Sequence, residues 1–133
     1  MTTTADVARL VLEHMAEHGL PEPASLHISA AFGQAESRVQ VRGDGLRDTV
    51  GVLLRWAGSV ATVRFRAWRT RRDSVHLDVD TTLTGSGGTV ALTVYGGVEF
   101  DHVTFTGLEI GAARPVSLGE FTAWATGGVG APS

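Results

Sequence analysis

The sequence predicts a single α+β domain. We expect an antiparallel sheet of four to six strands, a hairpin followed by a meander, with two or three helices packed on one face. The main observation is that residues 60–95 alternate between apolar and polar side chains, with the period of two that is typical of strands. In addition, segments with helical spacing of apolar residues stand before, between and after the strand-like segments. Together they give the order α-β-β-α-β-β-β-β-α.

The first helix is predicted over residues 4–18. Its apolar residues recur at helical spacing, namely Val7, Leu10, Val11 and Met15. Gly19 is expected to end the helix in the left-handed conformation. His14 and His18 lie one turn apart, which is the spacing of a pair of metal ligands. A histidine near a helix C-terminus is also favoured by the helix dipole, so no metal site is predicted.

A hairpin and a second helix follow. Residues 26–30 and 38–42 alternate as strands, with residues 32–36 as the loop between them. The second helix is predicted over residues 46–57, with Asp44 as its N-cap and Gly58 at its end. Gly51 weakens that helix, and we expect it to permit a close approach of helix and sheet.

The meander has the best-specified register. A turn centred on Arg72 sets apolar residues opposite each other on one face, Phe65 with Val79 and Ala67 with Leu77. The same register pairs Arg66 with Asp78, Arg64 with Asp80, and Trp68 with His76 on the other face. The glycine-rich residues 85–88 then form a hairpin loop, after which Leu83 faces Val90, Thr81 faces Leu92, Val79 faces Val94, and Tyr95 faces Asp78.

The C-terminal part is expected to add a strand and a helix. Residues 98–106 are predicted as a fourth meander strand, with a bulge near Asp101 that reconciles a break in the alternation. The last helix is predicted over residues 116–125 and begins with a capping box of Ser117 and Glu120. Residues 1–126 are predicted to form the domain and residues 127–133 a flexible tail.

Composition excludes several classes of function. All eleven basic residues are arginine, and lysine and asparagine are absent, which indicates the codon usage of a high-GC bacterium. The chain has no cysteine, which excludes disulfides and thiolate chemistry and fits a cytoplasmic protein. No apolar segment is long enough for a membrane span, and the N-terminus does not resemble a signal peptide. The net charge of −3 gives no general attraction to nucleic acid.

The sheet face away from the helices is the predicted site. It collects Arg64, Arg66, Trp68, His76, Asp78, Asp80 and Tyr95. Aromatic residues and arginine are the types that anchor protein interfaces. The leading hypothesis is a non-enzymatic interaction protein, a homodimer that uses this face, with its further partner unidentified. No catalytic residue, metal ligand or cofactor is predicted. The simplest alternative is a solvated face with cross-strand ion pairs and no function.

Two other functions remain open. In a strongly curved sheet, the same face would form a pocket for a small molecule or for acid–base catalysis. That outline is similar to the ketosteroid-isomerase-like folds, although no motif supports the likeness. The hairpin supplies a possible nucleic-acid contact through Arg69, Arg71 and Arg72, with Trp68 available for base stacking.

Overall fold

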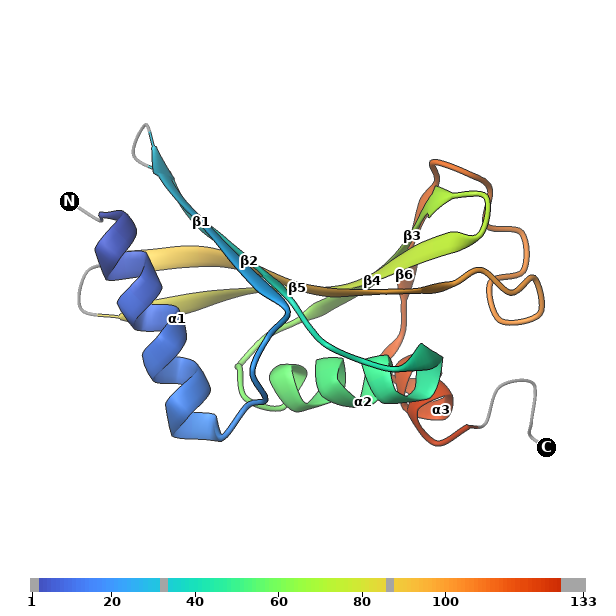
Figure 1. The fold of residues 1–133 in the computed structure, drawn as a ribbon, viewed down its shortest axis with the longest axis horizontal. Coiled ribbons are helices and arrows are strands. Elements are labelled where there is room, and N and C mark those ends of the chain that lie inside the picture. Colours follow the sequence, from blue (N-terminus) through green and yellow to red (C-terminus); the bar gives the residue numbers. More distant parts are fainter. Residues whose placement is uncertain (1–2, 32–33, 86–87, 128–133) are drawn as a thin grey trace.

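All three helices of the described chain lie on one side of its six-stranded sheet (Figure 1). The computed structural model describes residues 3–31, 34–85 and 88–127. The elements in chain order are α1 (Thr4–His18), β1 (Ser25–Ala31), β2 (Gln34–Gln40), α2 (Gly45–Ala57), β3 (Arg64–Arg71), β4 (Ser74–Gly85), β5 (Gly88–Glu99), β6 (Ala113–Val116) and α3 (Leu118–Ala125). The strand order is β1-β2-β5-β4-β3-β6. The predicted α+β class and element order are therefore confirmed.

Helix α1 is confirmed at both ends. Thr3 is its N-cap, and Thr3 and Asp6 form a reciprocal capping box. Gly19 follows the helix in the left-handed conformation with φ of 60°. No helix of the described residues is long and apolar enough to cross a membrane.

Helix α2 begins differently from the prediction. Asp44 occupies the N-cap position, but its side chain makes no capping hydrogen bond. Instead the backbone N–H of Asp44 donates to the carboxylate of Asp48 at 2.9 Å. The Asp44 side chain therefore does not satisfy the backbone N–H groups of the first turn.

At the other end of the helix, Gly58 has φ of −70°, which is in the right-handed rather than the left-handed region.

The predicted pairs of the meander are confirmed, but the register shifts between Arg69 and Arg71, so Arg71 pairs with Ser74 and the turn is not centred on Arg72. β3 and β4 pair Arg64 with Asp80, Arg66 with Asp78, and Trp68 with His76. β4 and β5 pair Asp78 with Tyr95, and they continue to the pair of Gly85 with Gly88. Residues 86–87 of the predicted loop lie outside the described residues. The apolar face of these strands is buried, as shown by Phe65, Ala67, Leu77, Val79, Leu92 and Val94.

Two predicted strands need correction. β2 begins at Gln34, so the predicted loop 32–36 is shorter, and Ala31 already pairs with Gln34. β5 continues through Gly96 and Gly97 to Glu99, and no separate strand occupies residues 98–106. Asp101 accepts hydrogen bonds from the Val103 N–H and the Thr104 hydroxyl, and such local bonds favour a turn over a strand.

The last strand is instead β6, which pairs with β3 on the side away from β4. Val116 ends this strand, so α3 begins two residues later than predicted. The predicted capping box of Ser117 and Glu120 is present at its start. Trp124 is buried and packs at 5.3 Å from Phe105, measured between ring centroids.

The sheet is mixed, not purely antiparallel. β1 and β2 form an antiparallel hairpin, but β2 pairs in parallel with β5, from Glu36 with Ala91 to Gln40 with Tyr95. This pairing joins the N-terminal hairpin to the meander. It lies between segments far apart in the chain, and α2, β3 and β4 come between them.

Glycine at the helix–sheet contact allows α2 to approach closely. A Cβ at Gly96 would lie 2.5 Å from Cγ2 of Thr49 and 3.0 Å from Cγ2 of Val41. A Cβ at Gly51 would meet nothing within 4 Å. The close approach of helix and sheet therefore depends on Gly96 of β5, and not on Gly51 of α2 as expected.

Candidate functional site

The predicted site residues lie on one face of the sheet, opposite the helices. We call this surface the polar-aromatic face and define it by Arg64, Arg66, Trp68, His76, Asp78, Asp80 and Tyr95. Arg64 and Arg66 are exposed, whereas Trp68, His76, Asp80 and Tyr95 are partly buried. Asp78 is 1% exposed although no helix of the described residues covers it. The surrounding side chains therefore enclose this carboxylate.

Arg66 neutralises the buried carboxylate of Asp78. Its Nε and Nη2 both donate to Oδ2 of Asp78, at 3.1 and 2.6 Å. The hydrogen bonds to Asp78 raise the pKa of Arg66 above its ordinary value. The other oxygen, Oδ1, is buried and has no hydrogen-bond partner. Asp78 therefore keeps one acceptor unused at the centre of the face.

An aromatic row crosses the face from β3 to β5. The rings of Trp68 and His76 meet edge to face at 5.7 Å, and those of His76 and Tyr95 stack at 5.3 Å. Arg38 extends the row to β2, because its guanidinium lies 5.0 Å from the centre of the Tyr95 ring. Arg38 was missed from the sequence, since only the parallel pairing of β2 with β5 brings it there.

The second predicted charge pair does not form an ion pair. Arg64 and Asp80 are opposite in register, but the ion pairs of the described residues are Arg9 with Asp6, Arg66 with Asp78 and Arg114 with Glu120. Asp80 instead accepts a hydrogen bond from the Thr93 hydroxyl at 2.8 Å. Arg64 is thus left as an exposed cation on the face.

The arginine-rich hairpin is only partly available to a ligand. Arg69 donates to the backbone oxygens of Arg72 and Leu108, and its guanidinium lies 3.5 Å from the centre of the Phe100 ring. These contacts hold the 101–112 loop against the hairpin. Arg71 and Arg72 are exposed at the tip.

His14 and His18 of α1 contact each other, and His14 also contacts the chain that follows α2. The rings of His14 and His18 lie 4.4 Å apart, and Nε2 of His14 lies 2.8 Å from the hydroxyl of Ser59. The Ser59 hydroxyl donates its single proton to the Trp56 carbonyl, so His14 acts as the donor to Ser59. This arrangement does not activate Ser59 as a nucleophile.

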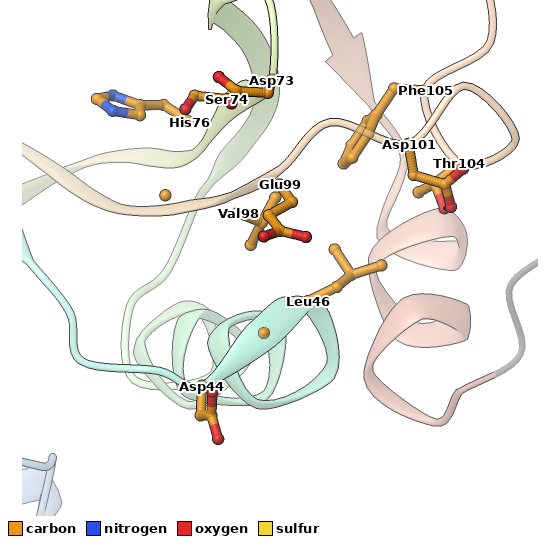
Figure 2. Close-up of a pocket in the computed structure, with 12 residues that line it drawn as sticks. Asp44, Leu46, Asp73, Ser74, His76, Val98, Glu99, Asp101, Thr104 and Phe105 are labelled. Carbon is orange, nitrogen blue, oxygen red and sulfur yellow. The ribbon is translucent and has the colours of Figure 1, made fainter.

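A cavity of about 740 Å³ lies beside the face, between the start of α2 and the end of β5 (Figure 2). Its titratable lining residues are Asp44, Asp73, His76, Glu99 and Asp101. The close-up shows Glu99 between β5 and Leu46, with Asp44 turned away from it. The cavity reaches His76 but is not lined by Asp78 or Tyr95.

The environment of His76 predicts an acid-dependent loss of stability. Burial lowers the pKa of His76 below its ordinary value of 6.5; Asp78 opposes this effect, while Arg38 and Arg71 add to it. Below pH 6.5 the unfolded chain therefore binds more protons at His76 than the folded chain does. The free energy of unfolding is highest above that pH and decreases as the pH falls through the pKa of His76 in the folded protein. We expect His76→Gln to reduce the loss of unfolding free energy between about pH 7.5 and pH 5 in urea titrations.

His14 provides an internal reference for this measurement. Burial, followed by the charge of His18, lowers its pKa too, so part of the acid-dependent loss should remain in His76→Gln. Equal losses in the parent protein and His76→Gln would contradict the assignment to His76.

The described residues contain no group of three or more histidine or acidic side chains arranged to hold a metal ion. Comparisons with protein-family models, with curated proteins and with solved structures give no match for this chain.

Proposed function

We propose that this chain is a non-enzymatic binding protein that forms a homodimer through the polar-aromatic face. The observation that supports the proposal is the partly exposed row of Trp68, His76 and Tyr95 on a sheet face that no described helix covers. Partly exposed aromatic side chains next to arginines are typical of interface anchors.

The charges on this face favour a second copy as the occupant. Arg66 and Asp78 neutralise each other, but Arg38 and Arg64 lie near Glu36 and Asp80, so the face still carries charges of both signs in equal number. A two-fold axis through such a face can place the cations of one copy over the anions of the other. Arg64 has no ion pair within the described residues, so it is available for this contact.

The size of the sheet is sufficient for such a dimer. Six strands of 4 to 12 residues, spaced at about 4.8 Å, make a face of up to about 800 Å² per copy. A dimer that covered the whole face would bury up to about 1,600 Å², the usual size of a stable interface. Because a twisted sheet brings only part of this area into contact, we expect a dimer that dissociates at low concentration.

Removing the aromatic anchors is expected to weaken the dimer. Trp68→Ala and Tyr95→Ala should each raise the dissociation constant by roughly tenfold or more, because each removes a large contact at the centre of the interface. The measurement is solution mass by light scattering behind a sizing column, across a range of protein concentrations.

Leu12→Ala is the matched control. Leu12 is an apolar residue of α1 that is 53% exposed and lies on the helical side of the molecule. This change should leave the dissociation constant unaltered. A parent protein that stays monomeric at high micromolar concentration would refute the dimer, as would equal effects of Leu12→Ala and Trp68→Ala.

Two alternatives have weaker support. A nucleic-acid contact would rest on Arg71 and Arg72, because Arg69 is engaged by backbone oxygens and Phe100. A small-molecule or acid–base site would rest on the unused Oδ1 of Asp78, with His76 and Tyr95 beside it. Binding to heparin that is lost in Arg71→Ala/Arg72→Ala would favour the first alternative.

A further inference from the structure

Strand β5 extends beyond the end of its neighbour β2. The parallel ladder runs from Glu36 with Ala91 to Gln40 with Tyr95, and the Val41 N–H then donates to the Tyr95 carbonyl at 2.8 Å. After Val41 the chain leaves the sheet and leads into α2, while β5 continues to Glu99 (Figure 1). In the described chain, no strand lies beside the outer edge of β5 past Tyr95.

The direction of the backbone groups follows from strand geometry. N–H and C=O groups of successive residues point alternately to the two sides of a strand. Tyr95 points toward β2, since its carbonyl accepts from Val41, so Gly97 and Glu99 point to the same side. On the other side the Phe100 N–H donates to the Asp73 carbonyl, in agreement with this alternation. The backbone groups of Gly97 and Glu99 thus face the free edge.

This free edge opens into the cavity described above, which we call the β5 edge groove. Gly97, Val98 and Glu99 form one wall, and the start of α2 together with Asp101, Thr104 and Phe105 forms others. Gly97 is exposed and has no side chain, so another backbone can come close to it. The volume of about 740 Å³ lies within the range of ligand pockets and suits an extended segment of a few residues.

The charge of the groove is negative. Glu99, Asp73 and Asp101 surround it, and its lining includes no arginine among the described residues. Hydrogen bonds from the Val103 N–H and the Thr104 hydroxyl lower the pKa of Asp101, so this carboxylate is ionised at neutral pH. Cationic side chains complement such a lining.

We propose that the β5 edge groove binds a short extended segment of a partner protein, rich in arginine or lysine, which adds as a strand along Gly97–Glu99. Backbone hydrogen bonds to Gly97 and Glu99 supply affinity, and the carboxylates select the cationic side chains. The groove shares His76 with the polar-aromatic face, but the added strand would lie along Gly97–Glu99 and needs no contact with Trp68 or Tyr95.

A defined peptide tests the proposal. The probe is an acetylated and amidated pentapeptide that alternates valine and arginine and carries a fluorophore, titrated with the full chain by fluorescence anisotropy. Gly97→Pro is expected to weaken binding at least about tenfold, because it removes the N–H that faces the edge and places a ring there. It removes no hydrogen bond of the β4–β5 ladder, so the fold should be retained.

Gly97→Ala is the matched control, because it keeps the N–H. Its Cβ would lie 3.7 Å from the His76 ring, an ordinary contact, and binding should stay within about twofold of the parent value. Glu99→Gln should weaken binding of the arginine peptide, and a peptide with glutamate in place of arginine should not bind.

A second probe keeps the test valid if Gly97→Pro does not fold. The same peptide, N-methylated at every residue, cannot donate a backbone hydrogen bond from either edge and should not bind the parent protein. The proposal is overturned if the N-methylated peptide binds as well as the unmodified one, if the unmodified peptide does not bind, or if Gly97→Pro and Gly97→Ala bind it equally. If Trp68→Ala loses binding and Gly97→Pro does not, the peptide binds to the polar-aromatic face instead. That result would also overturn the proposal.

Discussion

Replacing Arg66 with alanine is expected to lower the free energy of unfolding by about 2–3 kcal/mol, because it leaves the buried carboxylate of Asp78 without its cation. Removing one partner of a fully buried pair costs more, but the Arg66 side chain is 46% exposed, so water can reach part of the site. Urea unfolding followed by tryptophan fluorescence gives the value.

Arg64→Ala is the control for this change. Arg64 lies two residues away on the same strand and face, and it is exposed without an ion pair in the described chain. Its loss should change stability by less than about 0.5 kcal/mol. In the Arg66→Ala background, Asp78→Asn should recover part of the lost stability because it removes the buried charge. Equal stabilities of Arg66→Ala and Arg64→Ala would show that Asp78 does not need its partner.

Gly96→Ala is expected to destabilise the protein by about 2–3 kcal/mol, because the added methyl group overlaps with Thr49 and Val41 at the contact between α2 and β5. Both neighbours are buried, so relief requires a shift of the helix or of the strand. Thermal unfolding and urea titration of the purified variant measure the effect.

The matched substitution at Gly51 should have the opposite sign. Gly51 lies inside α2, and a Cβ there would meet nothing within 4 Å, so Gly51→Ala should stabilise the protein by roughly 0.5–1 kcal/mol. Adding Thr49→Ala to Gly96→Ala should restore part of the stability by removing the nearest clashing atom. A neutral Gly96→Ala would mean that α2 lies farther from β5 than described.

The meander could be predicted because its register is specified twice. Pairing Phe65 with Val79 buries apolar side chains, and the same alignment sets Arg66 against Asp78. A shift by one residue would violate both patterns, so the sequence leaves one solution. The seven residues of the polar-aromatic face were predicted as a group for this reason. The helices followed from apolar spacing, from Gly19 after the first helix, and from the capping box of Ser117 and Glu120 before the last, which are local signals.

The remaining features depend on non-local contacts. Nothing in residues 34–40 indicates that their partner is β5, so the place of Arg38 over Tyr95 could not be predicted. The strand predicted over residues 98–106 failed because the Asp101 side chain satisfies nearby backbone and hydroxyl donors within a turn. The free edge at Gly97 arises only from the different lengths of β2 and β5, which periodicity does not encode.

The parallel pairing of β2 with β5 also orders the events of folding. Glu36 meets Ala91 only after α2, β3, β4 and the first part of β5 have been synthesised and brought together. The meander consists of neighbours in the chain and can form early, whereas β2 must close a long loop to reach its partner. The N-terminal hairpin is therefore expected to join the sheet last, and until it does, the backbone of β5 from Ala91 to Tyr95 stays exposed as a template for strand exchange between chains.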